Sequence, residues 1–113
     1  MIHLIDAIRD FKIDNRARPA AWSEWISDTC YFHCEAMAKV GNLYHTPPTI
    51  RYNTFECVCS SGLFLEERDQ IRHMVFCLFG SSASHRELIL GSNTIGGCYF
   101  VKDNIAYITL RGY

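Results

Sequence analysis

The chain has 113 residues, of which 49% are hydrophobic and 20% are charged, and its formal net charge is −1. This length and composition predict one ordered domain, spanning 1–113, rather than a disordered chain. The sequence shows no basic stripe, which argues against nucleic-acid binding, because neutralising phosphates supplies much of the affinity of such proteins.

The beginning of the chain does not have the pattern of an export signal. Asp6 and Arg9 interrupt the apolar stretch that a signal peptide requires. No window approaches ~18 uninterrupted apolar residues, so the sequence predicts no membrane span. We therefore expect a cytoplasmic protein, in which the six cysteines are reduced and are buried, metal-bound or catalytic more often than paired in disulfides.

The first segment, residues 2–12, is predicted to be an amphipathic helix. Leu4, Ile8 and Phe11 recur at helical spacing, with charged residues on the other face. The polar residues that follow end at Pro19 and are expected to form a loop.

A second helix is predicted over residues 20–40. Pro19 suits the first turn of a helix, and Gly41 suits the position just past its end. The apolar or half-apolar residues at helical spacing are Trp22, Trp25, Ile26, Cys30, His33, Met37 and Val40. The segment TPP at 46–48 then excludes further helix, because the residue before a proline avoids the helical conformation.

The segments after Pro48 are rich in β-forming residues. Residues 50–59 predict a strand, in which a shift of apolar parity between Tyr52 and Phe55 indicates a bulge or a twist. The apolar run 74–79 favours a central strand that is buried on both faces. The alternative is one helix over 63–79, because so short a run is ambiguous by period alone.

The last third predicts short strands at 86–90, 97–101 and 105–110, the last two forming a tight hairpin through 102–104. The glycines within 91–97 are expected to serve turns or a strand bulge. Helices followed by strands indicate the α+β class, with a helical part at about 1–45 and a sheet part at about 49–113. We expect two N-terminal helices packed on one face of a C-terminal antiparallel sheet of four to five strands.

The cysteines admit three interpretations. We favour burial in the core, because free cysteine packs as a small hydrophobic residue. The second is a zinc-supported module, although these spacings are not those of an ordinary zinc site. Its ligands would be Cys30, Cys34, Cys57 and Cys59. The third is a nucleophile, Cys57 or Cys59 with His73, which lacks an activating feature.

No catalytic motif or phosphate-binding loop is present, so we expect neither an enzyme nor a cofactor. The leading hypothesis is a small binding module for another protein, of the inhibitor, immunity-protein or antitoxin kind, with its oligomeric state left open. Aromatic, acidic and loop residues are candidates for the contact surface. They are Trp22, Tyr31, Tyr44, Glu66, Glu67, Asp69, His85 and Arg86. The alternative is a small-ligand pocket or small enzyme on a curved sheet, with a cavity lined by Tyr52, Cys57, His73 and Tyr107.

Overall fold

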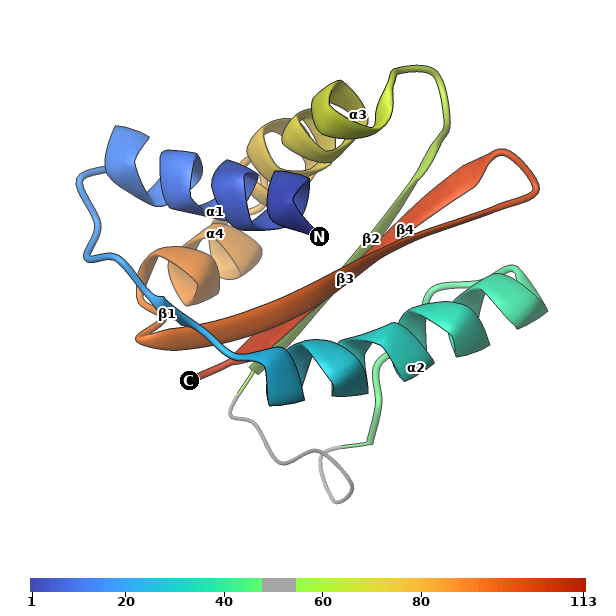
Figure 1. Ribbon diagram of the computed structural model, residues 1–113, viewed down its shortest axis with the longest axis horizontal. Helices are drawn as coiled ribbons and strands as arrows, with labels where there is room; N and C mark the ends of the chain where they lie inside the picture. Colours follow the sequence, from blue (N-terminus) through green and yellow to red (C-terminus); the bar gives the residue numbers. More distant parts are fainter. Residues whose placement is uncertain (48–54) are drawn as a thin grey trace.

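A four-stranded sheet lies between two helical layers (Figure 1). The computed structural model describes residues 1–47 and 55–113. The strands are β1 (Ala21–Trp22), β2 (Phe55–Gly62), β3 (Thr94–Lys102) and β4 (Ile105–Gly112), in the order β1-β3-β4-β2. One layer holds α1 (Ile2–Asp14), α3 (Glu67–His73), the π-helical η2 (Met74–Phe79) and α4 (Ala83–Leu90), and the other holds α2 (Glu24–Val40).

The α+β class is confirmed, but three details of the expected architecture are wrong. The two N-terminal helices do not share a face, because α1 and α2 lie on opposite sides of the sheet (Figure 1). The sheet is mixed, since β1 pairs with β3 in parallel while the other two pairings are antiparallel. Three helical segments also lie within 49–113, where the favoured interpretation placed only strands.

The alternation of side chains along the strands divides the core into two parts. On β2, Cys57 and Cys59 face the layer of α1 and η2, whereas Val58 faces α2. On β4, Ile108 likewise faces the layer of α1 and η2, and Tyr107 faces α2. Both faces of the sheet are therefore covered, and a polar residue on either inner face needs a partner inside the protein.

Two predicted strands are helices. The run 74–79 continues α3 as η2, which buries Met74, Val75 and Phe79 against the sheet and leaves Cys77 exposed. The helical alternative for this region was the better one. Residues 86–90 belong to α4. The buried Lys12 side chain holds the end of this helix, with Nζ 3.3 Å from the Ile89 carbonyl oxygen and 2.6 Å from that of Ser92, just after the helix.

The second helix begins later than predicted. Trp22 belongs to β1, and Ser23 caps α2 by accepting a hydrogen bond from the Ile26 N–H at 3.1 Å. The predicted end is confirmed, because Gly41 has the left-handed conformation (φ 72°) that suits glycine after a helix.

The predicted hairpin of β3 and β4 is confirmed, and Asp103 and Asn104 both have positive φ in its turn. Gly96 and Gly97 have another role than the expected one. They lie within β3, where glycine lets α2 approach the sheet on one face and α1 on the other. Among residues 1–47 and 55–113, no helix has both the length and the apolar character that a membrane crossing requires.

Candidate functional site

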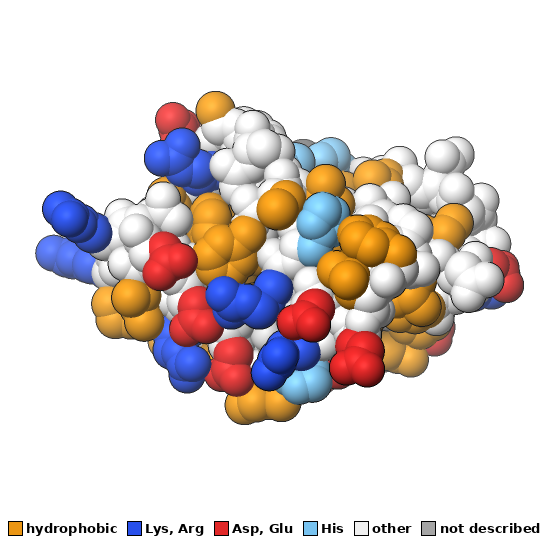
Figure 2. All heavy atoms as spheres, turned by 90° about the horizontal axis from the view of Figure 1, so that it is seen from above, with side chains coloured by type: hydrophobic (Ala, Val, Ile, Leu, Met, Phe, Trp, Pro, Cys, Tyr) orange, Lys and Arg blue, Asp and Glu red, His pale blue; other side chains and the backbone are white. Residues whose placement is uncertain are grey.

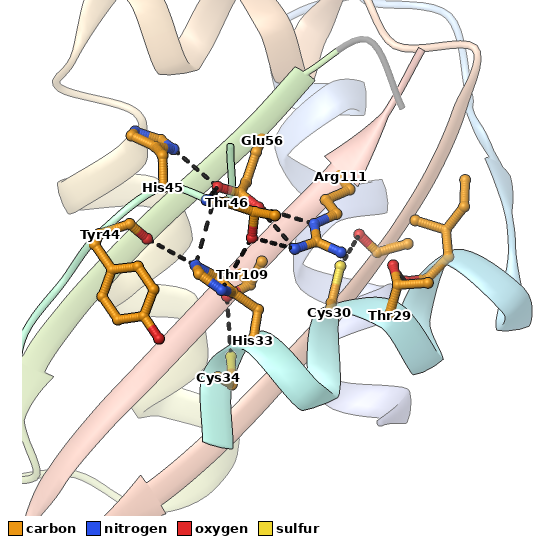
Figure 3. A network of polar contacts seen from close by, with 12 residues as sticks. Thr29, Cys30, His33, Cys34, Tyr44, His45, Thr46, Glu56, Thr109 and Arg111 are labelled. Carbon is orange, nitrogen blue, oxygen red and sulfur yellow. Dashed lines mark hydrogen bonds and ion pairs between the residues drawn. The ribbon is translucent and has the colours of Figure 1, made fainter. Parts of the chain in front are cut away.

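A buried carboxylate, that of Glu56 on β2, organises the segment that follows α2 (Figure 3). Its cross-strand partner on β4 is Arg111, whose Nε and Nη2 lie 2.9 and 2.8 Å from Glu56 Oε2. The other carboxylate oxygen, Oε1, accepts hydrogen bonds from the Thr46 N–H at 2.8 Å and from His45 Nδ1 at 3.0 Å. The pair therefore attaches the segment after α2 to the sheet.

The same segment is also attached to α2 itself. His33 Nε2 lies 2.7 Å from the Tyr44 carbonyl oxygen, which makes that nitrogen the donor, and His33 Nδ1 lies 3.0 Å from Thr46 Oγ1. Thr46 Oγ1 in turn accepts a hydrogen bond from Arg111 Nη2 at 2.7 Å. Residues 44–46 are therefore fixed by contacts to both the helix and the sheet.

The electrostatic environment favours the ionised form of Glu56. Burial raises the pKa of this carboxyl, but hydrogen bonds from Thr46, Arg111 and His45 outweigh burial, so that the pKa lies below its ordinary value of 4.5. Beyond this network, burial and the nearby charge of His45 lower the pKa of the α4 residue His85.

The lowered pKa of Glu56 predicts that the protein loses stability in acid. Because the pKa of folded Glu56 is lowered, its contribution is complete above pH 4.5 and is lost as pH falls through the folded-state pKa. Urea unfolding of wild type and Glu56→Gln at several pH values checks this. We expect wild type to be more stable at neutral pH and the difference to shrink below about pH 4. A difference that stays constant or grows on acidification would contradict the account.

The outward side of α2 is a second apolar face. Of the apolar residues that the helical period predicted, Cys30 and Met37 are fully buried, but Trp25 is 58% and Val40 63% exposed. Phe32, one heptad after Trp25, is 68% exposed. A helix that packs on one side only is normally polar on the other side, so this face, with Trp25, Phe32 and Val40, is unusual. We call it the outer face of α2.

Aromatic residues beside the outer face enlarge it. The exposed Tyr31 ring contacts Phe32 and also Phe100 of β3, with ring centroids 6.0 and 5.8 Å apart. At the C-terminal end of α2, Leu43 and Tyr44 are each 42% exposed. Because the Glu56 network fixes Tyr44, these side chains extend the outer face from a rigid segment.

The predicted contact residues do not form one surface. Tyr31 and Tyr44 lie on and after α2, whereas Glu66, Glu67 and Asp69 lie at the start of α3, on the other side of the sheet. His85 and Arg86 belong to α4, also in that other layer. Trp22 is half-buried in β1, and its indole N–H has no hydrogen-bond partner among the residues described.

The four cysteines of the zinc alternative are separated by the sheet. Cys30 and Cys34 pack between α2 and the sheet, while Cys57 and Cys59 face the opposite layer. Within the described part of the chain, no group of three or more His, Cys, Asp or Glu residues is arranged to hold a metal ion. Burial raises the pKa of the Cys30 and Cys57 thiols to about 12. The interpretation as core residues holds for five cysteines and is wrong for Cys77, which is exposed.

The face opposite α2 is charged, and several of its charges are paired within the protein. Figure 2 shows acidic and basic side chains side by side on it. Asp10 binds Arg72 at 2.9 Å, and Arg9 lies 3.3 Å from Asp6, around a groove of about 300 Å³ between α1 and α3.

The residues of the predicted ligand pocket do not meet. Cys57 and Tyr107 point to opposite sides of the sheet, and His73 packs on Phe64 at the start of the α3 layer. Tyr52 lies outside the described residues.

Comparison with known proteins finds solved structures that share this fold. The sequence matches no protein-family model and no curated protein. The structure resembles an outer surface protein from Borrelia burgdorferi, with TM-score 0.69 and 14% identity over 96% of this chain and 88% of that protein. It resembles NaASP2, in a crystal structure with Zn²⁺, with TM-score 0.67 and 12% identity over 96% and 74% of the two chains.

A third similar structure is that of an extracellular protein containing an SCP domain from Bacillus anthracis str. Ames. Its TM-score is 0.67 and its identity 13%, over 100% of this chain and 40% of the larger protein. At these identities the likeness shows a shared fold and nothing about activity. Two of the three proteins are extracellular or on the outer surface, which differs from the cytoplasmic location that we expected from the sequence.

Proposed function

We propose that this chain is a non-enzymatic protein-binding domain that covers a surface of its partner, as inhibitor, immunity and antitoxin proteins do. The observation that carries the proposal is the outer face of α2, where Trp25 and Phe32 are 58% and 68% exposed on a helix whose inner side is already packed. Exposed tryptophan and tyrosine side chains are typical of binding hot spots, because they bury a large area at a small cost in conformational entropy.

The buried polar network supports a scaffolding role rather than a catalytic one. Both oxygens of Glu56 accept hydrogen bonds within the protein, and both nitrogens of His33 are used in the same way. A general acid or base needs an atom that reaches a substrate. These groups instead fix the position of Tyr44 beside the outer face.

A zinc-dependent role, which the Zn²⁺ in the NaASP2 structure suggests, is not part of the proposal. Zinc sites in proteins use several N, O or S ligands around one point. Glu56, the carboxylate closest to His45, is already neutralised by Arg111. The described residues therefore do not fit such a site.

We retain the cytoplasm as the proposed compartment. All six cysteines are free thiols in the structure, which is typical of proteins that work in a reducing environment. Fractionation of the native host cells, with immunodetection of the chain, tests this. Recovery of the protein only outside the cell would contradict it.

Comparative capture tests the binding function. Tagged wild type, the double variant Trp25→Ser/Phe32→Ser and the control Phe64→Ser are each used to capture proteins from the native host. Phe64 is the matched control because it is 62% exposed but lies in the other layer. We expect a protein that wild type and Phe64→Ser retain and the double variant loses, by about 30-fold or more in affinity. Equal capture by all three would refute the use of the outer face, provided that circular dichroism shows the variants folded.

A further inference from the structure

We infer that the partner presents a basic amphipathic helix to the outer face of α2. This inference rests on the proposed function and specifies the chemistry of the partner. It follows from an acidic row that runs beside the apolar face and from the length of that face. It also follows from the α2 backbone, whose hydrogen-bonding groups are already used within the helix.

The acidic row consists of Glu24, Asp28 and Glu35, all exposed and all on one side of the row formed by Trp25 and Phe32. Positions 24, 28 and 35 lie on the same side of a helix because they are about one and two turns apart. None of the three carboxylates makes an ion pair or a hydrogen bond with any residue in 1–47 or 55–113. The acidic row is therefore available to a cationic partner.

Several carboxylates of the opposite layer differ from the acidic row in this respect. There the carboxylates of Asp6, Asp10 and Glu67 are each held by an arginine or a histidine of the same chain, at 2.8 to 3.3 Å. The whole chain has a net charge of only −1. On α2 the exposed charges are three carboxylates and one ammonium, that of Lys39, so the surface there is acidic, and most clearly so toward its N-terminal end.

The geometry favours a helical partner segment. The backbone donors and acceptors of α2 are used within the helix, so a β-strand has nothing to pair with there. An amphipathic helix instead places apolar side chains on the row of Trp25 and Phe32 and basic side chains over the acidic row. From Glu24 to Glu35 the helix rises by about 16 Å, which requires about three turns of the partner.

The inference is tested with a synthetic helical peptide of leucine and lysine, about four turns long, and a matched peptide with glutamate in place of lysine. Binding to the full chain is measured by NMR shifts of backbone amides at two salt concentrations. The acidic-row variant is Glu24→Gln/Asp28→Asn/Glu35→Gln. Its control, Glu66→Gln/Glu67→Gln/Asp69→Asn, removes three acidic charges from the other layer.

We expect the lysine peptide to shift amides of α2, to bind more weakly in high salt, and to lose about tenfold in affinity with the acidic-row variant but not with its control. Equal binding of both peptides at α2 would overturn the basic partner and leave the proposed function standing. Binding of neither peptide, or equal weakening by both variants, would also overturn it. A concentration-dependent dimer, abolished by Phe32→Ser in sedimentation, would assign the face to a second copy of the chain instead.

Discussion

Replacement of Arg111 by methionine is expected to lower the free energy of unfolding by about 3–5 kcal/mol, since it leaves a buried carboxylate without its cation. The Glu56 side chain has no exposed surface, and Arg111 supplies both contacts to its Oε2. The change also removes the donor to Thr46 Oγ1, so the segment after α2 loses one of its attachments to the sheet. Urea unfolding, with the slope checked for constancy, measures the effect.

The double variant Glu56→Gln/Arg111→Met is the control for this explanation. If the cost comes from an unpaired buried charge, the double variant loses less stability than the sum of the two single variants, because it buries no charge at all. Additive losses would show that the two side chains act independently. A loss of less than about 1 kcal/mol in Arg111→Met would show that the pair is solvated like a surface ion pair.

Replacement of Gly96 by alanine is expected to cost about 2–3 kcal/mol, through overpacking between α2 and β3. A Cβ atom at this position would lie 2.7 Å from the Ser27 backbone nitrogen and 2.8 Å from Ile26 Cβ, so the start of α2 has to move. That movement would also lengthen the hydrogen bond from the Gly97 N–H to Ser27 Oγ, now 3.2 Å. Thermal and urea unfolding measure the loss.

Gly62→Ala is the matched control for Gly96→Ala. Gly62 also belongs to a strand of the sheet, but a Cβ atom there would have no atom within 4 Å. We expect its stability to stay within about 0.5 kcal/mol of wild type. If the two alanine variants are equally stable, α2 is not packed as closely on β3 as the structure indicates.

Local patterns in the sequence predict the elements in which apolar residues recur at one regular spacing or which end in recognisable turn residues. The helix 2–12, the glycine end at Gly41 and the hairpin through 102–104 follow from apolar spacing and turn residues. The run 74–79 was predicted as a strand because all six residues are apolar, and the period carries no information in such a run. Only the packed structure shows that Cys77 points outward while Phe79 points inward.

The polar network was missed because its members are far apart in the sequence. His33, Thr46, Glu56 and Arg111 meet only when β2 pairs with β4 and α2 packs on one face of the sheet. A signal was available, since Glu56 is a lone charge in the apolar strand FECVC and Arg111 is a lone charge after ITL. A charge in a buried strand needs a partner of opposite sign, which favours this pairing.

The sequence indicated the aromatic character of the outer face of α2 but not which residues form it. The aromatic residues in 22–44 are too many to face one way, which left open whether some are covered by the sheet or exposed, and the helical period did not show which. Trp25 was assigned to the inner row with Ile26, and the structure places it outside. The reason is that neighbouring residues on a helix are about 100° apart, so only one of two successive apolar residues can face the centre of the core.

The most direct test of the central claim, that the outer face of α2 contacts a partner protein, is site-specific photocrosslinking in the native host. A benzoyl-phenylalanine side chain replaces Phe32 in one protein and Phe64 in the other, two positions of similar exposure in opposite layers. The account predicts a discrete crosslinked protein from position 32 and none from position 64. Crosslinks from position 64 alone, or from neither position, would contradict it.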